Sequence, residues 1–191
     1  MSDRTRTITQ LKRLDVGDGI VLRPVRLYNG EEIYAAVVDN RNSLTRWLPW
    51  VDGVRGLPDV RDFIRRSMDE QAGGIAVQLG IWKDASFIGM VGLHGVDWAN
   101  RRTSMGYWLA EHEWGRGVMT ASTRTLVDFA INDLELNRVE IRCGVDNAAS
   151  RAIAERLDFE LEGTARQDML LNGRYVDLVI YAVLACEWRR G

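Results

Sequence analysis

The chain has 191 residues, of which 46% are hydrophobic and 27% charged, with a formal net charge of −2. This composition is typical of one globular domain, and it argues against a nucleic-acid binder driven by overall positive charge. Two cysteines, Cys143 and Cys186, make no disulfide framework, and with only His94 and His112 as histidines we expect no metal site. No apolar run approaches the roughly 18 residues that span a bilayer. Residues 1–10 also lack the apolar stretch of a signal peptide, so we expect a cytoplasmic protein without a membrane partner.

The first part of the domain combines one strand with two helices. Residues 19–27 predict a strand bounded by glycine. Apolar residues at helical spacing predict a helix over residues 31–48, which Pro49 ends. A second helix is predicted over residues 57–73, because its apolar residues recur at the same spacing and a glycine pair follows.

The centre of the chain reads as three strands followed by a helix. Residues 75–83 and 87–96 are apolar runs separated by three small or polar residues, which predicts a hairpin. Residues 103–111 predict a third strand. From Gly117 the pattern changes to helical spacing and stays so until about Asn132.

The last part alternates strands with one short helix. Residues 138–145 alternate apolar and charged side chains, as a half-buried strand does. Residues 147–159 predict a helix with Asn147 at its N-cap. Residues 159–184 predict two strands joined at Asn172-Gly173, a strong signal for a hairpin turn.

This order of elements predicts an α+β (mixed α/β) fold. The hairpins make the sheet mostly antiparallel, and the later strand–helix–strand unit adds a parallel pair. We expect a central mixed sheet of about seven strands with helices on both faces. Residues 1–18 are polar and predict an extension that is loose at its start, before a single domain over residues 19–191.

A glycine turn, "EWGRGVMTAS" at residues 113–122, is the first candidate for a binding site. Backbone N–H groups at a helix start attract an anion, and Gly115 and Gly117 let the backbone approach it. Arg116 adds a charge that suits phosphate. Thr120 stands where a dinucleotide-binding fingerprint has its third glycine, and a Walker loop would need a lysine. The pyrophosphate of coenzyme A remains, as does a tight turn that holds nothing.

A second motif favours coenzyme A. "YWLAEHEWGRGVMT" and the later "VDNAASRAIAERLDFELEG" resemble the acetyl-CoA motifs of the GNAT superfamily of N-acetyltransferases. "LRPVR", "LTRWLPW" and the closing "LNGRYVDLVIYAVL" extend the resemblance to the RimJ/RimL branch, which acetylates N-terminal amines of ribosomal proteins. The resemblance covers about residues 20–185.

The resemblance implies a GNAT-type fold and an acetyl-CoA-dependent N-acetyltransferase. The acceptor would be a primary amine, above all a protein N-terminal α-amine of ribosomal-protein type, with direct transfer in a ternary complex. It also implies a homodimer. A small-molecule amine or amino-acid acetyltransferase of the same fold stays open, as does a catalytically silent CoA-binding or interaction domain.

The same resemblance assigns roles to individual residues. Glu111, as a partly buried carboxylate at the end of its strand, would accept the proton of the amine; otherwise it is a surface glutamate. Ser150 would protonate the leaving thiolate; otherwise its hydroxyl bonds its own helix backbone. A backbone N–H near Leu109 or Ala110 would bind the oxyanion. The expected cofactor-binding residues are Trp108, Leu109, Ala110, Gly115, Arg116, Gly117, Val118, Met119, Thr120, Asn147 and Ser150.

Several positions depart from the family pattern. His112 stands at a Gln/Arg position and has no assigned role, and Asp158-Phe159 replaces a Gly-Phe pair. Ala154 stands where many members have a proton-donating tyrosine, so that helix supplies no tyrosine acid. Cys143 could carry the acetyl group covalently, but a core cysteine on an alternating strand is the simpler interpretation.

The acceptor pocket is predicted from aromatic residues alone. Trp47 and Trp50, in "LTRWLPW", would wall the pocket, as the aromatic segment of the resembling branch does. Either tryptophan could instead pack beneath the preceding helix. A protein N-terminus, a free amino acid, a polyamine or an aminoacyl conjugate would each fit.

Overall fold

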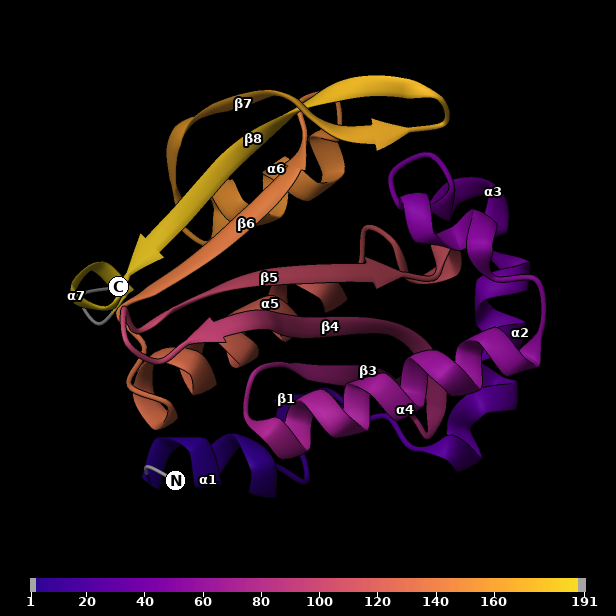
Figure 1. The fold of residues 1–191 in the computed structure, drawn as a ribbon, viewed down its shortest axis with the longest axis horizontal. Coiled ribbons are helices and arrows are strands. Elements are labelled where there is room, and N and C mark those ends of the chain that lie inside the picture. Colours follow the sequence, from indigo (N-terminus) through magenta and orange to yellow (C-terminus); the bar gives the residue numbers. More distant parts are fainter. Residues whose placement is uncertain (1–2, 189–191) are drawn as a thin grey trace.

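A computed structural model describes residues 3–188. Within that range one sheet has eight strands in the order β1-β2-β3-β4-β5-β6-β8-β7 (Figure 1). The strands are β1 Leu14–Gly17, β2 Ile20–Pro24, β3 Val77–Lys83, β4 Ser86–Asp97, β5 Arg102–Leu109, β6 Arg138–Gly144, β7 Glu160–Leu171 and β8 Arg174–Leu184. All neighbouring pairs are antiparallel except β5 and β6. The predicted mixed, mostly antiparallel sheet is confirmed, with one strand more than expected.

Helices cover both faces of this sheet, as predicted. In Figure 1, α4 lies in front of the strands with α2 beside it at their right-hand end, and α5 and α6 lie behind the strands. The α-helices are α1 Asp3–Gln10, α2 Gly30–Asp39, α3 Arg41–Leu44, α4 Leu57–Gly73, α5 Val118–Asp128, α6 Ala148–Arg156 and α7 Ala185–Trp188. Short turns of other helix types are η1 Leu27–Asn29, η2 Pro49–Gly53, η3 Glu111–Glu113 and the π-helical η4 Phe129–Asp133. No helix of residues 3–188 is long and apolar enough to cross a membrane.

The two faces bury separate cores. Behind the sheet, residues such as Leu126 and Ile131 pack against Leu79 and Ile141. In front of it, side chains of α2 and α4 pack against Trp82, Phe87 and Trp108 of the sheet. Trp82 and Phe87 meet edge to face with ring centroids 5.4 Å apart, a favoured aromatic geometry. The aromatic residues on β3, β4 and β5 therefore fix how the front helices sit over these strands.

The start of the chain differs from the expectation of a loose extension. β1 pairs with β2, and Ile8 of α1 is fully buried in the rear core together with Leu11. These two apolar residues were too few to outweigh the polar residues around them in the sequence. Residues 3–17 thus contribute to the sheet and the core, while the division of the chain at residue 18 stays a prediction.

The predicted helix over residues 31–48 is interrupted. α2 ends at Asp39, and Asn40 separates it from α3. The buried Asn40 side chain donates from Nδ2 to the carbonyl of Ala36 at 2.9 Å, so it caps the end of α2. Asparagine in a helix interior competes with the backbone in this way, and the apolar spacing alone did not reveal it.

The two predicted hairpin turns are confirmed. Asp84 and Ala85 have φ of 48° and 69° between β3 and β4, and Asn172 and Gly173 have 50° and 75° between β7 and β8. Two consecutive residues with positive φ give the turn whose twist matches that of antiparallel strands.

Candidate active site

The parallel strands β5 and β6 separate halfway along their length. They pair over Arg102–Met105 and Arg138–Ile141. Beyond these residues β5 pairs only with β4 and β6 only with β8. Figure 1 shows the two strands starting side by side and diverging toward α3. Backbone groups on the two facing edges are thereby left open to a ligand.

Leu109 presents its backbone to this opening. The N–H of Ala110 donates to the carbonyl of Ile88 at 2.8 Å, and hydrogen-bonded pairs alternate along an antiparallel ladder. The polar groups of Leu109 therefore point away from β4. In agreement, the indole of Trp114 donates to the carbonyl of Leu109 at 2.9 Å. Of the two predicted oxyanion donors, the Ala110 N–H is already bonded and the Leu109 N–H faces the opening.

The glycine turn has the backbone that the sequence predicted. Gly115 and Gly117 have φ of 72° and 78°, in the left-handed region that favours glycine. Gly117 is the N-cap of α5, and a side chain added there would meet no atom within 4 Å. The N-terminus of α5 therefore opens onto free space, which suits an anion at a helix start.

A buried ion pair holds the segment before this turn. Glu113, whose side chain is only 8% exposed, accepts a bond of 2.9 Å from Nζ of Lys83 on β3. Arg116 lies 3.6 Å from the same carboxylate. The bond from Lys83 is the main reason why the pKa of Glu113 lies below its ordinary value. Sequence reasoning left Glu113 without a role; the structure makes it an anchor that ties the glycine turn to the sheet.

Ser150 lies in the first turn of α6, next to a tyrosine of β5. Its N–H donates to Oδ1 of Asn147 at 3.1 Å, which confirms Asn147 as the N-cap. The Ser150 hydroxyl lies 3.0 Å from the hydroxyl of Tyr107. Tyr107 also donates to the Ser150 carbonyl at 3.2 Å. Burial raises the pKa of Tyr107, so the phenol stays neutral and orients the serine. Tyr107 of β5 thus places a phenol next to Ser150, although the helix has alanine instead of tyrosine at position 154.

Cys143 lies close to this serine but is built as a core residue. It is 7% exposed and belongs to the rear core. Burial raises the pKa of its thiol, although Ser150 and Arg151 act in the opposite direction. A nucleophilic cysteine needs a lowered pKa, so the simpler interpretation of Cys143 holds in the structure.

Glu111 lies just past the end of β5, in the short η3 helix rather than in the strand. Its backbone N–H donates to Oδ1 of Asn40 at 2.8 Å. The side chain is exposed rather than partly buried, because the chain turns outward after Leu109. Asn40 therefore links the end of α2 to the predicted base, a contact across 71 positions that no local sequence pattern signals.

A cavity of about 650 Å³ lies on the other side of the sheet, beneath α2 and α4. Trp108 and Trp50 form part of its wall, with ring centroids 6.5 Å apart. Trp47 does not line it and packs instead near Gly144, at the end of β6. The structure thus separates the two tryptophans predicted together. It also places the Trp108 side chain in this cavity, so only backbone of Trp108 is left for the predicted cofactor contact.

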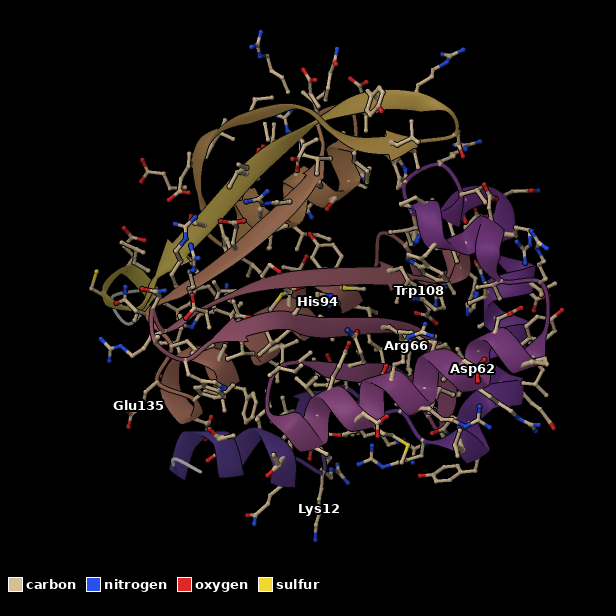
Figure 2. All side chains as sticks on the ribbon, in the orientation of Figure 1. Lys12, Asp62, Arg66, His94, Trp108 and Glu135 are labelled. Atoms are coloured by element: carbon tan, nitrogen blue, oxygen red, sulfur yellow. The ribbon has the colours of Figure 1, made fainter. Side chains whose placement is uncertain are left out.

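The polar lining of this cavity was not predicted. Arg66 and Asp62 come from α4, and His94 comes from β4 (Figure 2). Nδ1 of His94 lies 3.0 Å from Nε2 of Gln78 on β3. The His94 side chain is exposed to the cavity, but partial desolvation by the protein atoms around it lowers its pKa below the ordinary value of 6.5, while the nearby Glu70 acts to raise it. Only the sheet register and the packing of α4 bring these residues together, since they are spread over three separate elements.

The splayed parallel strand pair and the glycine turn at a helix start agree with the fold that the sequence resemblance implied. The family model of the acetyltransferase (GNAT) domain matches residues 20–160, so the chain belongs to this family. GNAT enzymes use acetyl-CoA, and the predicted enzyme class and cofactor are confirmed.

Individual relatives resemble most of the chain. It is 34% identical over 174 residues to the putative ribosomal N-acetyltransferase YdaF of Bacillus subtilis (strain 168), covering 91% of this chain and 95% of the relative. The solved structure of RimL, a ribosomal alpha-N-protein acetyltransferase in complex with coenzyme A, superposes with a TM-score of 0.88. Its sequence is 28% identical, covering 91% of this chain and 98% of that one.

Another similar structure is that of an acetyltransferase not named for ribosomal proteins. The structure of the microcin self-immunity acetyltransferase MccE, in complex with acetyl-CoA and AMP, superposes with a TM-score of 0.84 and 31% identity. The match covers 88% of this chain and 94% of that one. The similarity to RimJ/RimL acetyltransferases that the sequence motifs predicted is confirmed. The similar structures also include MccE, an acetyltransferase that is not named for ribosomal proteins.

Proposed function

We propose that this acetyltransferase acts on a protein N-terminal α-amine of ribosomal-protein type, by direct transfer from acetyl-CoA within a ternary complex. The observation that carries the proposal is the cavity beneath α4, which lies across β5 from the glycine turn. Its volume, about 650 Å³, has room for more than an amino group, and it is open to solvent at the exposed Trp50. The names of YdaF and RimL support the same acceptor.

On this proposal the cofactor lies on the side of α5 and α6. Backbone N–H groups from Arg116 to Thr120 cradle the pyrophosphate, with the dipole of α5 behind them. Val118 and Met119 begin the helix there, and both side chains are buried. The pantetheine arm follows the opening along Leu109 and Ala110, with Asn147 on its far side. The thioester carbonyl then meets the Leu109 N–H, which stabilises the oxyanion.

The reaction replaces the carbon–sulfur bond of the thioester with a carbon–nitrogen bond, and a proton leaves nitrogen while sulfur gains one. The amine nitrogen attacks the thioester carbon, and Glu111 accepts a proton from nitrogen, directly or through one water. The carbon–sulfur bond then breaks, and the Ser150 hydroxyl, held by Tyr107, gives the thiolate its proton. Much of the acceleration comes from holding both reactants in place. Glu111 suits its role because η3 places it beside the opening, where the exposed side chain can turn toward an incoming amine.

We also propose that the protein works in the cytoplasm as a homodimer. The exposed apolar residues Leu170 and Tyr175, which lie opposite each other near the turn of the β7–β8 hairpin, support an interface there. A stretch of apolar surface on neighbouring strands is unusual on a monomer.

The acceptor is tested with a panel assay for thiol release. Acetyl-CoA is offered with peptides that have a free N-terminus, the same peptides blocked at the N-terminus but containing lysine, free amino acids, polyamines and an aminoacyl nucleotide. We expect turnover with the free N-termini. The AMP in the MccE complex is the reason to include the nucleotide; turnover with that compound alone would favour a small-molecule acetyltransferase. Stabilisation by acetyl-CoA without turnover on any amine would favour a silent binding domain.

A further inference from the structure

His94 lies at the point where the two halves of the site meet. It belongs to the same face of β4 as Met90 and Gly92, which lie opposite Trp108 and Gly106 of β5. This is the face that forms the cavity beneath α4. A side chain added at Gly106 would come within 2.9 Å of Nε2 of His94, so the imidazole lies directly over that glycine.

Gly106 is the first residue of β5 beyond its pairing with β6. The last paired residues are Met105 and Ile141. The imidazole therefore lies on the acceptor side of the sheet, at the narrow end of the opening through which the thioester would be reached. Absence of a side chain at Gly106 is what leaves room for it.

We propose that His94 takes the first proton from the acceptor, converting the arriving ammonium group into the free amine. This inference rests on the proposed function. An α-amine has a pKa of about 7.7–8.0 and is mostly protonated at neutral pH. Two protons must leave the nitrogen before the amide is complete. His94 removes the first, the nitrogen keeps the electron pair with which it attacks the thioester, and Glu111 accepts the second during attack. The first proton passes from His94 to water in the open cavity.

The surroundings of His94 suit a neutral base. The His94 side chain is exposed to the water of the cavity, yet the protein atoms packed around it lower its pKa below the ordinary value, so neutral Nε2 is available to accept a proton, while Glu70 on α4 favours the protonated form. Arg66, Asp62 and Asp59 of α4 line the same cavity, and Gln78 of β3 touches Nδ1. The Gln78 amide can donate its N–H to Nδ1. If the amide group is flipped, its oxygen instead accepts a hydrogen bond from Nδ1–H, which leaves Nε2 free to accept a proton and supports the imidazolium.

The test compares pH profiles of kcat/KM with a free-N-terminus peptide. The wild-type acid limb should follow His94, below pH 6.5. In the His94→Asn variant, only amine that arrives deprotonated can react. The midpoint of its acid limb should therefore move to about pH 8, the pKa of the amine itself. The variant should thus be about 10-fold slower at pH 7 and approach wild type above about pH 9. His112→Asn, the other histidine, should leave the acid limb where it is.

Two controls keep the outcomes separate. Thermal stabilisation by acetyl-CoA should be the same in wild type and His94→Asn, because His94 lies on the acceptor side. Gln78→Glu should move the acid limb upward, since a carboxylate stabilises the imidazolium. Superimposable pH profiles of wild type and His94→Asn, or a loss in the variant that is equal at every pH, would overturn the role of His94 and leave the proposed function standing. Failure of wild type to acetylate any amine would instead overturn the proposed function.

Discussion

The two sides of β5 are built in different ways. On the rear side, the glycine turn and the starts of α5 and α6 come from residues 113–122 and 147–150, two short runs of sequence. On the front side, the cavity draws Trp50, Arg66, Gln78, His94 and Trp108 from five separate segments. A site that holds a constant cofactor is therefore contained in local motifs, whereas the site for the acceptor depends on how distant segments pack.

The anchoring of the two sides differs as well. The rear side is held by backbone geometry, with positive φ at Gly115 and Gly117, and by a buried ion pair at Glu113. The front side is a wide cavity with exposed charged side chains on α4. Substitutions on the rear side should thus affect cofactor binding, and those on the front side should affect which amine reacts.

The largest effect is expected at the glycine turn. Gly117→Ala forces alanine into a left-handed conformation, which costs roughly 1–2 kcal/mol, and it adds a methyl group where we expect the pyrophosphate. Acetyl-CoA at about 100 times the wild-type Kd should stabilise wild type by about 2.7 kcal/mol and the variant hardly at all. Gly173→Ala is the matched control, because φ there is 75° and a side chain would likewise meet no atom within 4 Å. Equal stabilisation of both variants by acetyl-CoA would contradict the cradle.

The next effect is expected at the predicted base. Glu111→Gln keeps the size of the side chain and removes the proton acceptor, so kcat should fall roughly 100- to 1000-fold with the Kd for acetyl-CoA unchanged. Stopped-flow thiol release with a saturating peptide measures it. Glu160→Gln, an exposed glutamate at the start of β7, serves as the control. A normal kcat in Glu111→Gln would leave His94 as the only base.

A smaller loss is expected for the proton donor. Ser150→Ala should lower kcat roughly 100-fold, at the low end for a positioned proton donor, because a thiolate is a fair leaving group even unprotonated. Cys143→Ala, on the adjacent strand, should leave turnover largely intact and the kinetics should remain those of a ternary complex. A ping-pong pattern in wild type, lost in Cys143→Ala, would show that the cysteine carries the acetyl group.

The smallest effect concerns stability rather than catalysis. Glu113→Gln breaks the bond from Lys83 and should cost roughly 1–2 kcal/mol of unfolding free energy at pH 7. The pKa of Glu113 is lower in the folded protein than its ordinary 4.5, so the ion pair stabilises above that pH. Its contribution should disappear as the pH falls through the lowered value. Urea melts of wild type and variant at pH 7 and pH 3 measure this, with the exposed Glu31→Gln as control. A difference that does not shrink as the pH falls would mean that the ion pair is not its cause.

Much of the fold and of the rear site could be predicted from the sequence. Period-two and helical spacing predicted the main elements, the Asn172-Gly173 turn predicted the last hairpin, and Asn147 was recognised as a cap. These features depend on neighbouring residues only. Asn40 and residues 3–17 were mistaken because long-range contacts, the N–H of Glu111 and the rear core, decide their conformation.

The front site could not be predicted for the same reason. His94 reads as one polar residue within an apolar strand, and its partner Gln78 lies 16 positions away on another strand. Only the register of β3, β4 and β5 places Gln78 beside Gly92 and His94 beside Gly106. Tyr107 was visible in the motif, but its contact with Ser150 spans 43 positions, so the motif did not reveal that it orients the proton donor.

The central claim is that the rear site delivers an acetyl group to an α-amine held in the front cavity. Its most direct test is mass spectrometry of two peptides of identical sequence that contain one lysine, one with a free and one with a blocked N-terminus, after incubation with enzyme and acetyl-CoA. We expect a gain of one acetyl group at the N-terminus of the free peptide and none on the blocked one. Acetylation of the lysine in both peptides, or of neither peptide while small amines react, would contradict it.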